Sequence, residues 1–178
     1  MKAGYIFPYG SCVYNTNDEY SDVDLILVGE GEIIINGKCD CQYYSKEEFQ
    51  ELIDQHEISA LECIFQGIEH EFTFNLDLEV LRRSISAKAS NSWVKAKKKI
   101  NQGDIRIGQK SLFHSLRIVM YGCQIAEHGQ IIDYQCANKY WDIIKNIEDW
   151  ELLKETFQPL KNQLNSKFRE LAPLDKGK

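Results

Sequence analysis

The sequence predicts an α+β fold, in which a small mixed sheet with helices is followed by a C-terminal helical bundle. Two runs of branched and aromatic residues, 4–9 and 22–28, have the composition of strands. From about residue 78, apolar residues recur at helical spacing. This change of period predicts two domains, residues 1–77 and 78–178, with a boundary near 76–80.

The first domain is expected to alternate strands, turns and short helices. Pro8 weakens the end of the first strand, since proline donates no ladder hydrogen bond. Asn-Gly between two strand-like runs predicts a hairpin over 32–44. Ser45 and Glu48 have the spacing of a capping box. The remaining expectations are a helical turn after Gly10-Ser11, helices over 46–55 and 59–67, and an extended segment over 69–75.

The second domain is expected to be helical throughout. Residues 78–100 predict one long helix or two. Leu112, Leu116 and Cys123 share one face of a helix over 109–129, and Gly129 is a suitable C-cap. Two further helices are expected near 133–146 and 149–171.

Composition and charge limit the class of protein. No run approaches the roughly 20 apolar residues of a membrane helix, and the first residues lack the layout of a signal peptide. None of the six cysteines forms a CxxC pair, and the four histidines have no zinc spacing. We therefore expect reduced thiols, mostly buried, in a cytoplasmic protein with no membrane partner.

Charge is unevenly distributed within the net −6 of the chain. Residues 1–78 carry 16 acidic and 3 basic side chains, whereas residues 79–110 carry 9 basic and 2 acidic ones. The acidic part is suited to metal ions and the basic part to an anionic ligand. Two solvated faces that pair with each other are the alternative.

One short stretch combines two kinds of chemical group. Gly10-Ser11 ends an apolar strand, and glycine allows the backbone to approach a phosphate closely. Asp22 and Asp24 lie two residues apart on a predicted strand, so their side chains point to the same face. Paired carboxylates of this kind suit Mg²⁺, which binds oxygen ligands together with substrate phosphates.

Gly-Ser, ten residues, then Asp-Val-Asp-Leu resembles the signature of the DNA polymerase β-type nucleotidyltransferases. The family places a third carboxylate on a neighbouring strand, and Asp40 is the best match. The resemblance thus implies catalytic and metal-binding roles for Asp22, Asp24 and Asp40, with phosphate on Gly10 and Ser11. Two alternatives stay open. The strand register could turn Asp40 to solvent, or Glu30 or Glu32 could face the site in its place.

A fainter resemblance links residues 40–65 and 110–129 to the predicted nucleotidyltransferases of bacteria and phages. It implies that Glu62, His114 and Arg117 face the cleft, although packing roles for His114 and Arg117 are equally open. Lys88 and Lys110 are candidate triphosphate contacts. The chain departs from the family at Cys12, at Asn15 and in its short segment before Gly10, and none of these departures removes a metal ligand.

The resemblance implies a metal-dependent nucleotidyltransferase that uses Mg²⁺ or Mn²⁺ and a nucleoside triphosphate such as ATP. It would move a nucleoside monophosphate to an acceptor hydroxyl and release pyrophosphate. RNA or DNA is the favoured acceptor, with Trp93 as a base-stacking residue; a protein side chain or a small molecule is the alternative.

Two other hypotheses belong to different classes of function. One is a catalytically silent nucleotide-binding or antitoxin-like regulatory module on the same fold, with a protein partner. The other is a structural protein with an acidic strand. A phage origin, with action in the host cytoplasm, is a further alternative for this protein.

Overall fold

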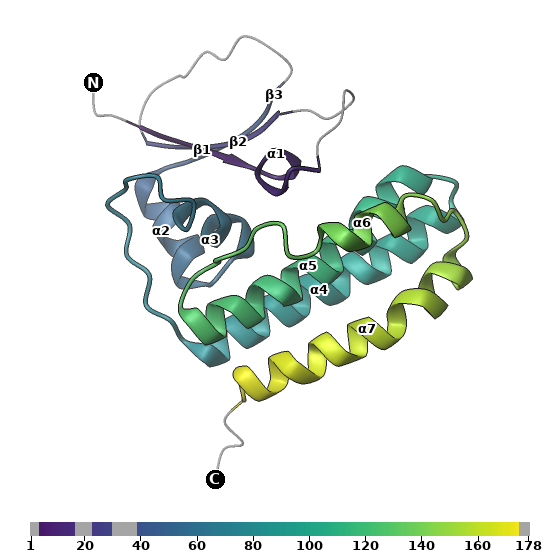
Figure 1. The fold of residues 1–178 in the computed structure, drawn as a ribbon. Helices are drawn as coiled ribbons and strands as arrows, with labels where there is room; N and C mark the ends of the chain where they lie inside the picture. Colours follow the sequence, from purple (N-terminus) through teal and green to yellow (C-terminus); the bar gives the residue numbers. More distant parts are fainter. Residues whose placement is uncertain (1–3, 17–22, 30–38, 175–178) are drawn as a thin grey trace. The chain divides into compact units, whose positions relative to one another are not determined.

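The computed structural model describes residues 4–16, 23–29 and 39–174 of the 178-residue chain. The chain divides into two compact units, Met1–Asn75 and Leu76–Lys178, here called unit 1 and unit 2 (Figure 1). Unit 1 holds a small mixed sheet with helices, and unit 2 is helical. The predicted fold class is therefore confirmed.

Unit 1 is built on a three-stranded sheet of order β1-β2-β3, in which β1 is antiparallel and β3 parallel to the central β2. Pro8 lies in β1, an edge strand of this described sheet, where a missing N–H is tolerated. The elements of unit 1 are β1 (Tyr5–Tyr9), α1 (Ser11–Tyr14), β2 (Val23–Val28), β3 (Cys39–Tyr44), α2 (Lys46–Asp54) and α3 (Ile58–Ile64).

Most local predictions for unit 1 are confirmed, including the helical turn after Gly10-Ser11 and the Ser45/Glu48 capping box. The first strand and the turn of the predicted hairpin fall on residues 30–38, outside the described residues. The segment 69–75 forms no regular strand. It is held instead by Gln50, whose side chain donates to the carbonyl of Thr73 and accepts from its N–H.

An aromatic core fixes the helices of unit 1 to one face of the sheet. Phe7 of β1 is fully buried and stacks on Phe49 of α2 with ring centroids 5.5 Å apart. Phe72 meets Phe49 edge-on at 4.9 Å. Because side chains alternate along a strand, Tyr9 lies on the same face of β1 as Phe7, beyond this core.

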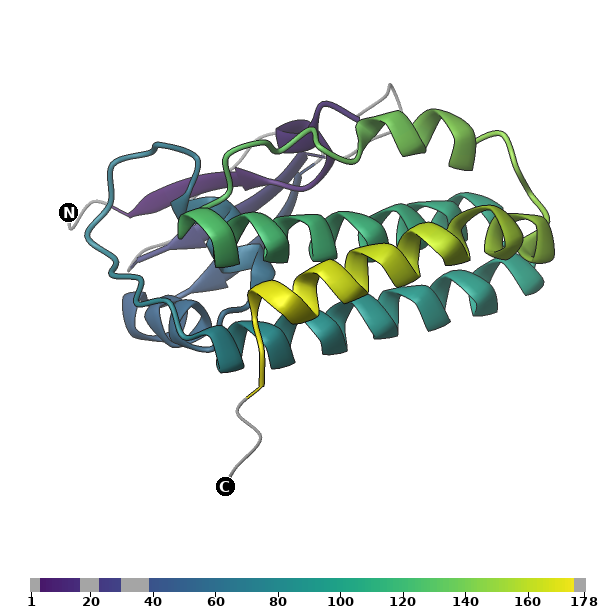
Figure 2. The same ribbon diagram turned by 60° about the horizontal axis from the view of Figure 1, so that its bottom comes forward.

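Unit 2 consists of α4 (Leu78–Asn101), α5 (Ile105–His128), α6 (Asn138–Ile144) and α7 (Trp150–Leu171). Residues 78–100, for which the sequence predicted one long helix or two, belong to the single helix α4. Gly129 ends α5 in the left-handed conformation, as its position predicted. In Figure 2, α7 lies along the pair formed by α4 and α5, both of which it contacts.

Two features hold the helices of unit 2 together. At Gly108 of α5, an added Cβ would lie 2.4 Å from Ile100 and 3.0 Å from the carbonyl oxygen of Ala96, so the α4 and α5 backbones approach closely. Trp93 packs edge-on against Trp150 at 5.4 Å, and Nζ of Lys161 lies 4.3 Å from the Trp93 ring centroid. The prediction that Trp93 stacks a base is therefore wrong, because its ring belongs to the core.

The long helices and the cysteines bear on two expectations about the class of protein. Within the described residues, no helix is both long and apolar enough to cross a bilayer. All six cysteines are free thiols, but only Cys63 and Cys123 are buried, so the expectation of mostly buried thiols is only partly met.

Candidate functional site

The turn between β1 and α1 requires glycine at position 10. Gly10 has φ 75° and ψ −151°, a backbone conformation that residues other than glycine rarely adopt. A Cβ added there would lie 2.2 Å from Oδ2 of Asp24. The two halves of the sequence motif are therefore in direct contact, and only glycine leaves room for the Asp24 carboxylate.

Strand register brings a second carboxylate beside Asp24. Asp24 of β2 pairs with Asp40 of β3, and Tyr9 of β1 pairs with Asp24 on the other side. Laterally paired residues share a face of a sheet, about 4.8 Å from strand to strand. Asp24 is half-buried and Asp40 is exposed, so Asp40 shares a face with Asp24 and is also open to solvent. Asp22 lies outside the described residues.

Tyr9 is a component of this cluster that sequence reasoning missed. Burial, followed by the nearby carboxylates of Asp24 and Asp40, raises the pKa of Tyr9 to about 12. Tyr9 is therefore protonated at neutral pH. Its position directly before Gly10, at the end of the same strand, is the signal that could have identified it.

Two polar side chains of β3 continue the cluster across the sheet. Nε2 of Gln42 donates to the Tyr9 hydroxyl at 2.8 Å, and the Tyr44 hydroxyl donates to Oε1 of Gln42 at 2.9 Å. Gln42 lies two residues after Asp40 and hence on the same face. Because the Tyr9 oxygen accepts from Gln42, its own O–H can donate toward the carboxylate side.

Helix α3 and the residues directly after it hold the Gly10-Ser11 turn from both ends. After the turn, the Tyr14 hydroxyl donates to Oε2 of Glu62 at 2.5 Å. Before it, Nε2 of Gln66 donates to the carbonyl of Pro8 at 2.7 Å. Glu62 is only 1% exposed, so it anchors α1 and does not present its carboxylate to a cleft.

The other four predicted site residues, Lys88, Lys110, His114 and Arg117, all lie in unit 2. Lys88 of α4 and Lys110 of α5 are exposed. Nη2 of Arg117 donates to Nδ1 of His114 at 2.5 Å, because a guanidinium cannot accept. His114 is therefore a neutral imidazole that carries its proton on Nε2.

Burial holds the pKa of His114 well below its usual value, and the positive charges of Arg117, Lys88 and Lys95 lower it further. Arg117 is buried between aromatic rings, with its guanidinium carbon 5.4 Å from the centroid of Phe113 and 5.8 Å from that of Tyr121. A packing role and a binding role are both compatible with this pair.

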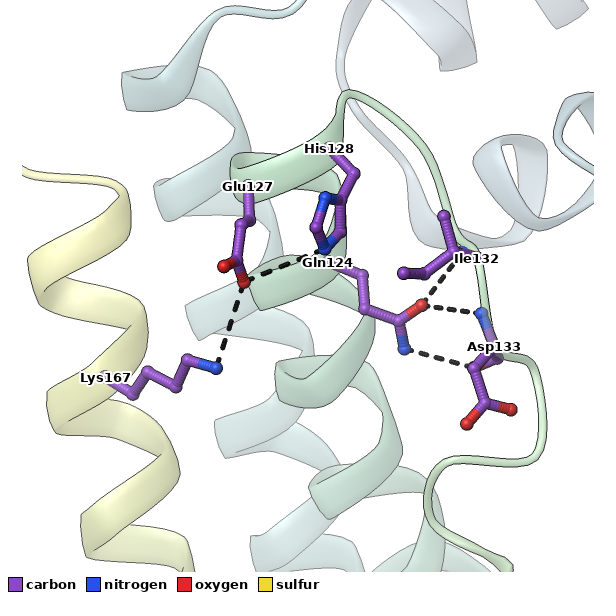
Figure 3. A network of polar contacts seen from close by, with 6 residues as sticks. All are labelled: Gln124, Glu127, His128, Ile132, Asp133 and Lys167. Atoms are coloured by element: carbon purple, nitrogen blue, oxygen red, sulfur yellow. Dashed lines mark hydrogen bonds and ion pairs between the residues drawn. The ribbon is translucent and has the colours of Figure 1, made fainter.

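The connection between α5 and α6 is held against α5 by polar contacts (Figure 3). Oε1 of Gln124 accepts from the backbone N–H groups of Ile132 and Asp133, both at 2.8 Å, and its Nε2 donates to the Asp133 carbonyl. The Tyr121 hydroxyl donates to the carbonyl of Tyr134 at 2.6 Å. This connection also carries Cys136, whose thiol is close enough to Arg117 for that charge to lower its pKa against the raising effect of burial.

The donor set of the unit 1 cluster fits a hard divalent cation. Asp24 and Asp40 offer carboxylate oxygens on one face, and the close approach of Gly10 leaves the Asp24 carboxylate beside the turn. Within residues 4–16, 23–29 and 39–174, no group of three His, Cys, Asp or Glu side chains is arranged to hold a metal. Asp22, the remaining carboxylate of the predicted set, is not among these residues.

Comparison with known proteins identifies the class of the first part of the chain. Residues 4–87 match the family model described as a nucleotidyltransferase domain. This match covers all of the described elements of unit 1 and continues into α4. No curated protein and no solved structure matches the chain.

Proposed function

Because residues 4–87 belong to the family of nucleotidyltransferase domains of the polymerase β type, we propose that this protein transfers a nucleoside monophosphate from a nucleoside triphosphate to an acceptor hydroxyl. Pyrophosphate is the second product. The observation that carries the proposal is the contact between Gly10 and the Asp24 carboxylate, with Asp40 in register beside it.

Asp22, Asp24 and Asp40 would hold Mg²⁺ or Mn²⁺, since all three offer carboxylate oxygens. When bound, such an ion neutralises phosphate charge and polarises the reacting oxygens. Without it, carboxylates this close to a triphosphate would repel the substrate. The need for a metal ion therefore explains why acidic side chains lie together at a site that binds an anionic substrate.

The chain itself positions the triphosphate and receives a proton. The backbone N–H groups of the turn and the Ser11 hydroxyl donate to phosphate oxygens. Glu62 of α3 and Gln66 just after this helix hold the turn through Tyr14 and Pro8. The acceptor oxygen forms a bond to the α-phosphorus while the bond from that phosphorus to the bridging oxygen of pyrophosphate breaks. Asp40 is exposed, so its carboxylate oxygen can take the proton that the acceptor hydroxyl loses.

Lys88, Lys110, His114 and Arg117 are proposed as further contacts to the triphosphate. Two of them, Lys88 and Lys110, are exposed cations, and His114 offers a neutral N–H donor.

The test is calorimetric titration of the full chain with ATP, CTP, GTP and UTP, with and without Mg²⁺. We expect binding that needs the metal and that is lost in Asp22→Ala/Asp24→Ala, whereas Glu51→Gln, an exposed acid of α2, binds like wild type. Transfer of α-labelled nucleotide is then measured in the same variants. Retained transfer in the double variant would refute the proposal, and binding without any transfer would favour the silent regulatory module.

A further inference from the structure

Tyr9 carries its hydroxyl to β3, on the face of the sheet that holds Asp24 and Asp40. Its own strand, β1, is separated from β3 by β2, a distance of about 9.6 Å at 4.8 Å per strand. The Tyr9 hydroxyl nevertheless lies 2.8 Å from Nε2 of Gln42 in β3. The phenol ring therefore crosses β2 beside Asp24, its partner in the register, and its polar end lies next to β3.

Asp40 is a neighbour of this hydroxyl along β3. It lies two residues before Gln42 and hence on the same face of the strand. The charges of Asp24 and Asp40 both act on the Tyr9 hydroxyl. Because Asp40 is exposed, a ligand can reach its carboxylate oxygens.

Two hydrogen bonds fix the direction in which the Tyr9 hydroxyl donates. Gln42 donates to its oxygen, and Gln42 is itself held by the Tyr44 hydroxyl, which donates to Oε1. The Tyr9 proton therefore points away from Gln42. The negative charges of Asp24 and Asp40 favour the same direction, because they attract the hydrogen of a neutral hydroxyl.

This arrangement leaves one donor and one acceptor close to each other. Among residues 4–16, 23–29 and 39–174, no group accepts the Tyr9 proton and no side chain donates to the Asp40 carboxylate. A ligand hydroxyl matches such a pair, because its oxygen can accept one hydrogen bond while its proton is donated in another. An ionised phosphate oxygen matches it less well, since it has no proton to donate and the carboxylate repels it.

We propose that Tyr9 is a ligand-binding residue of the site, whose O–H donates to the oxygen of a hydroxyl group that itself donates to Asp40. Gln42 is the positioning residue for Tyr9. The hydroxyl belongs either to the ribose of the nucleoside triphosphate or to the acceptor, which share this chemistry. The inference rests on the proposed function, which brings both molecules to the aspartates. Tyr9 keeps its proton in either case, so the bonds that form and break in the transfer are unchanged.

The test compares Tyr9→Phe with Gln42→Glu in the full chain. Tyr9→Phe removes the donor. In Gln42→Glu the carboxylate accepts from Tyr9 where the amide donated to it, so the contact between the two side chains remains but the proton turns away from the ligand. Both variants should therefore lose the hydrogen bond to the ligand, whereas a purely structural role of Tyr9 predicts a defect in Tyr9→Phe alone.

Calorimetry with Mg²⁺ measures the affinity for whichever of ATP, CTP, GTP and UTP binds best, for its 2′-deoxy and 3′-deoxy forms, and for inorganic tripolyphosphate. If the ribose is the ligand, Tyr9→Phe should bind the ribonucleotide roughly fivefold to tenfold more weakly, the value of one hydrogen bond, and should bind one deoxy form as wild type does. Gln42→Glu should show the same difference between the ribonucleotide and that deoxy form. Its added charge cannot produce this difference, because the charge acts on every ligand.

If the acceptor hydroxyl is the ligand, Tyr9→Phe should keep the wild-type affinities for nucleotides. Transfer of α-labelled nucleotide to acceptors in a cell extract should then fall roughly fivefold or more in both variants. Weaker binding of tripolyphosphate by Tyr9→Phe, to the same degree as of the nucleotides, would overturn the inference in favour of a phosphate contact. A Gln42→Glu variant that matches wild type in every assay would also overturn it, and Tyr9 would be a structural residue.

Tyr43→Phe is the matched control, because it removes a tyrosine hydroxyl from the same strand on the opposite face of the sheet. It should match wild type, and urea unfolding shows whether all three variants are folded. If wild type binds and transfers nucleotide but Tyr9→Phe and Gln42→Glu do so equally well, the hydroxyl contact falls and the proposed function stands. If wild type binds no triphosphate and transfers nothing, the proposed function falls and this inference falls with it.

Discussion

Tyr9 of unit 1 and His114 of unit 2 are two titratable groups whose surroundings are opposite in charge. Burial disfavours the charged form of both. Carboxylates surround Tyr9 and raise its pKa further, whereas cations surround His114 and lower its pKa further. Each neighbourhood thus keeps its central group neutral and gathers charge of one sign around it.

The difference teaches which ligand each neighbourhood suits. Asp24 and Asp40 favour a cation, and through it a triphosphate, whereas Lys88 and Lys95 favour phosphate directly. A protein that binds a triphosphate together with a metal ion can use both kinds of surface. The predictions below remove one contribution at a time from either neighbourhood.

Asp24→Asn should have the largest effect. If the carboxylate supports several kcal/mol of transition-state stabilisation, transfer activity falls roughly 10³-fold or more. The pKa of Tyr9 should fall as well, because the Asp24 charge raises it, yet it should stay above the ordinary value because burial is the larger cause. Nuclear magnetic resonance titration of the tyrosine rings measures this, with Tyr9→Phe to assign the signal.

Glu51→Gln serves as the control for Asp24→Asn, since it removes an exposed acid of the same unit. It should change neither transfer nor the Tyr9 titration. An unchanged Tyr9 pKa in Asp24→Asn would show that the carboxylate does not act on the hydroxyl, and the unit 1 half of the comparison would fail.

The sequence was sufficient for the architecture because its signals are local. Capping by Ser45 and Glu48, the left-handed Gly129 and the helical period after residue 78 all depend on neighbours within one or two turns. That Gly10 and Asp24 belong to one site was also foreseeable, since both are part of one sequence motif.

The supporting contacts were not foreseeable, because they depend on packing between distant segments. Tyr14 and Glu62 are 48 residues apart, and Gln66 and Pro8 are 58 residues apart. Trp93 shows the opposite error. Its basic surroundings in the sequence suggested an exposed ring, but its own helical spacing places it with Leu81, Ile85, Ala89 and Ala96 on the buried face of α4.

Gly10→Ala sharpens the comparison by moving the carboxylate without removing it. We expect a loss of about 1–3 kcal/mol in stability from the positive φ, and a further loss because the Cβ displaces Asp24. Gly67→Ala is the matched control, because Gly67 has φ +76° but nothing lies within 4 Å of its added Cβ. Urea unfolding and Mg²⁺-dependent ATP binding should both suffer more in Gly10→Ala, and equal losses would contradict the contact.

His114 makes the stability of unit 2 depend on pH. The folded pKa lies well below the unfolded value of about 6.5, so the unfolded state binds the proton first. The contribution is complete above pH 6.5 and is lost as the pH falls below it, by up to about 1.4 kcal/mol per pH unit. Urea unfolding should show this decline in wild type and less of it in His114→Asn, whose side-chain oxygen can still accept from Arg117.

His128→Asn is the control for this measurement, because His128 is exposed at the end of α5. It should keep the wild-type decline. Identical pH profiles in wild type and His114→Asn would show that the imidazole titrates normally, and the charge argument for unit 2 would lose its support.

Gln124→Ala should have the smallest effect and separates burial from charge around His114. Gln124 accepts two backbone hydrogen bonds from the connection that carries Cys136 near Arg117 (Figure 3). Their loss should cost about 1 kcal/mol locally and speed hydrogen exchange at the N–H groups of Ile132 and Asp133. Because burial is the largest cause of the low His114 pKa, that pKa should rise toward its ordinary value as the connection loosens.

Gln130→Ala is the control, because it changes an exposed glutamine of the same connection. It should change neither the hydrogen exchange of Ile132 and Asp133 nor the His114 pKa. Faster exchange with an unchanged His114 pKa would assign the burial of His114 to the helices α4 and α5 themselves, and the charges of Lys88 and Lys95 would then be the variable part of its environment.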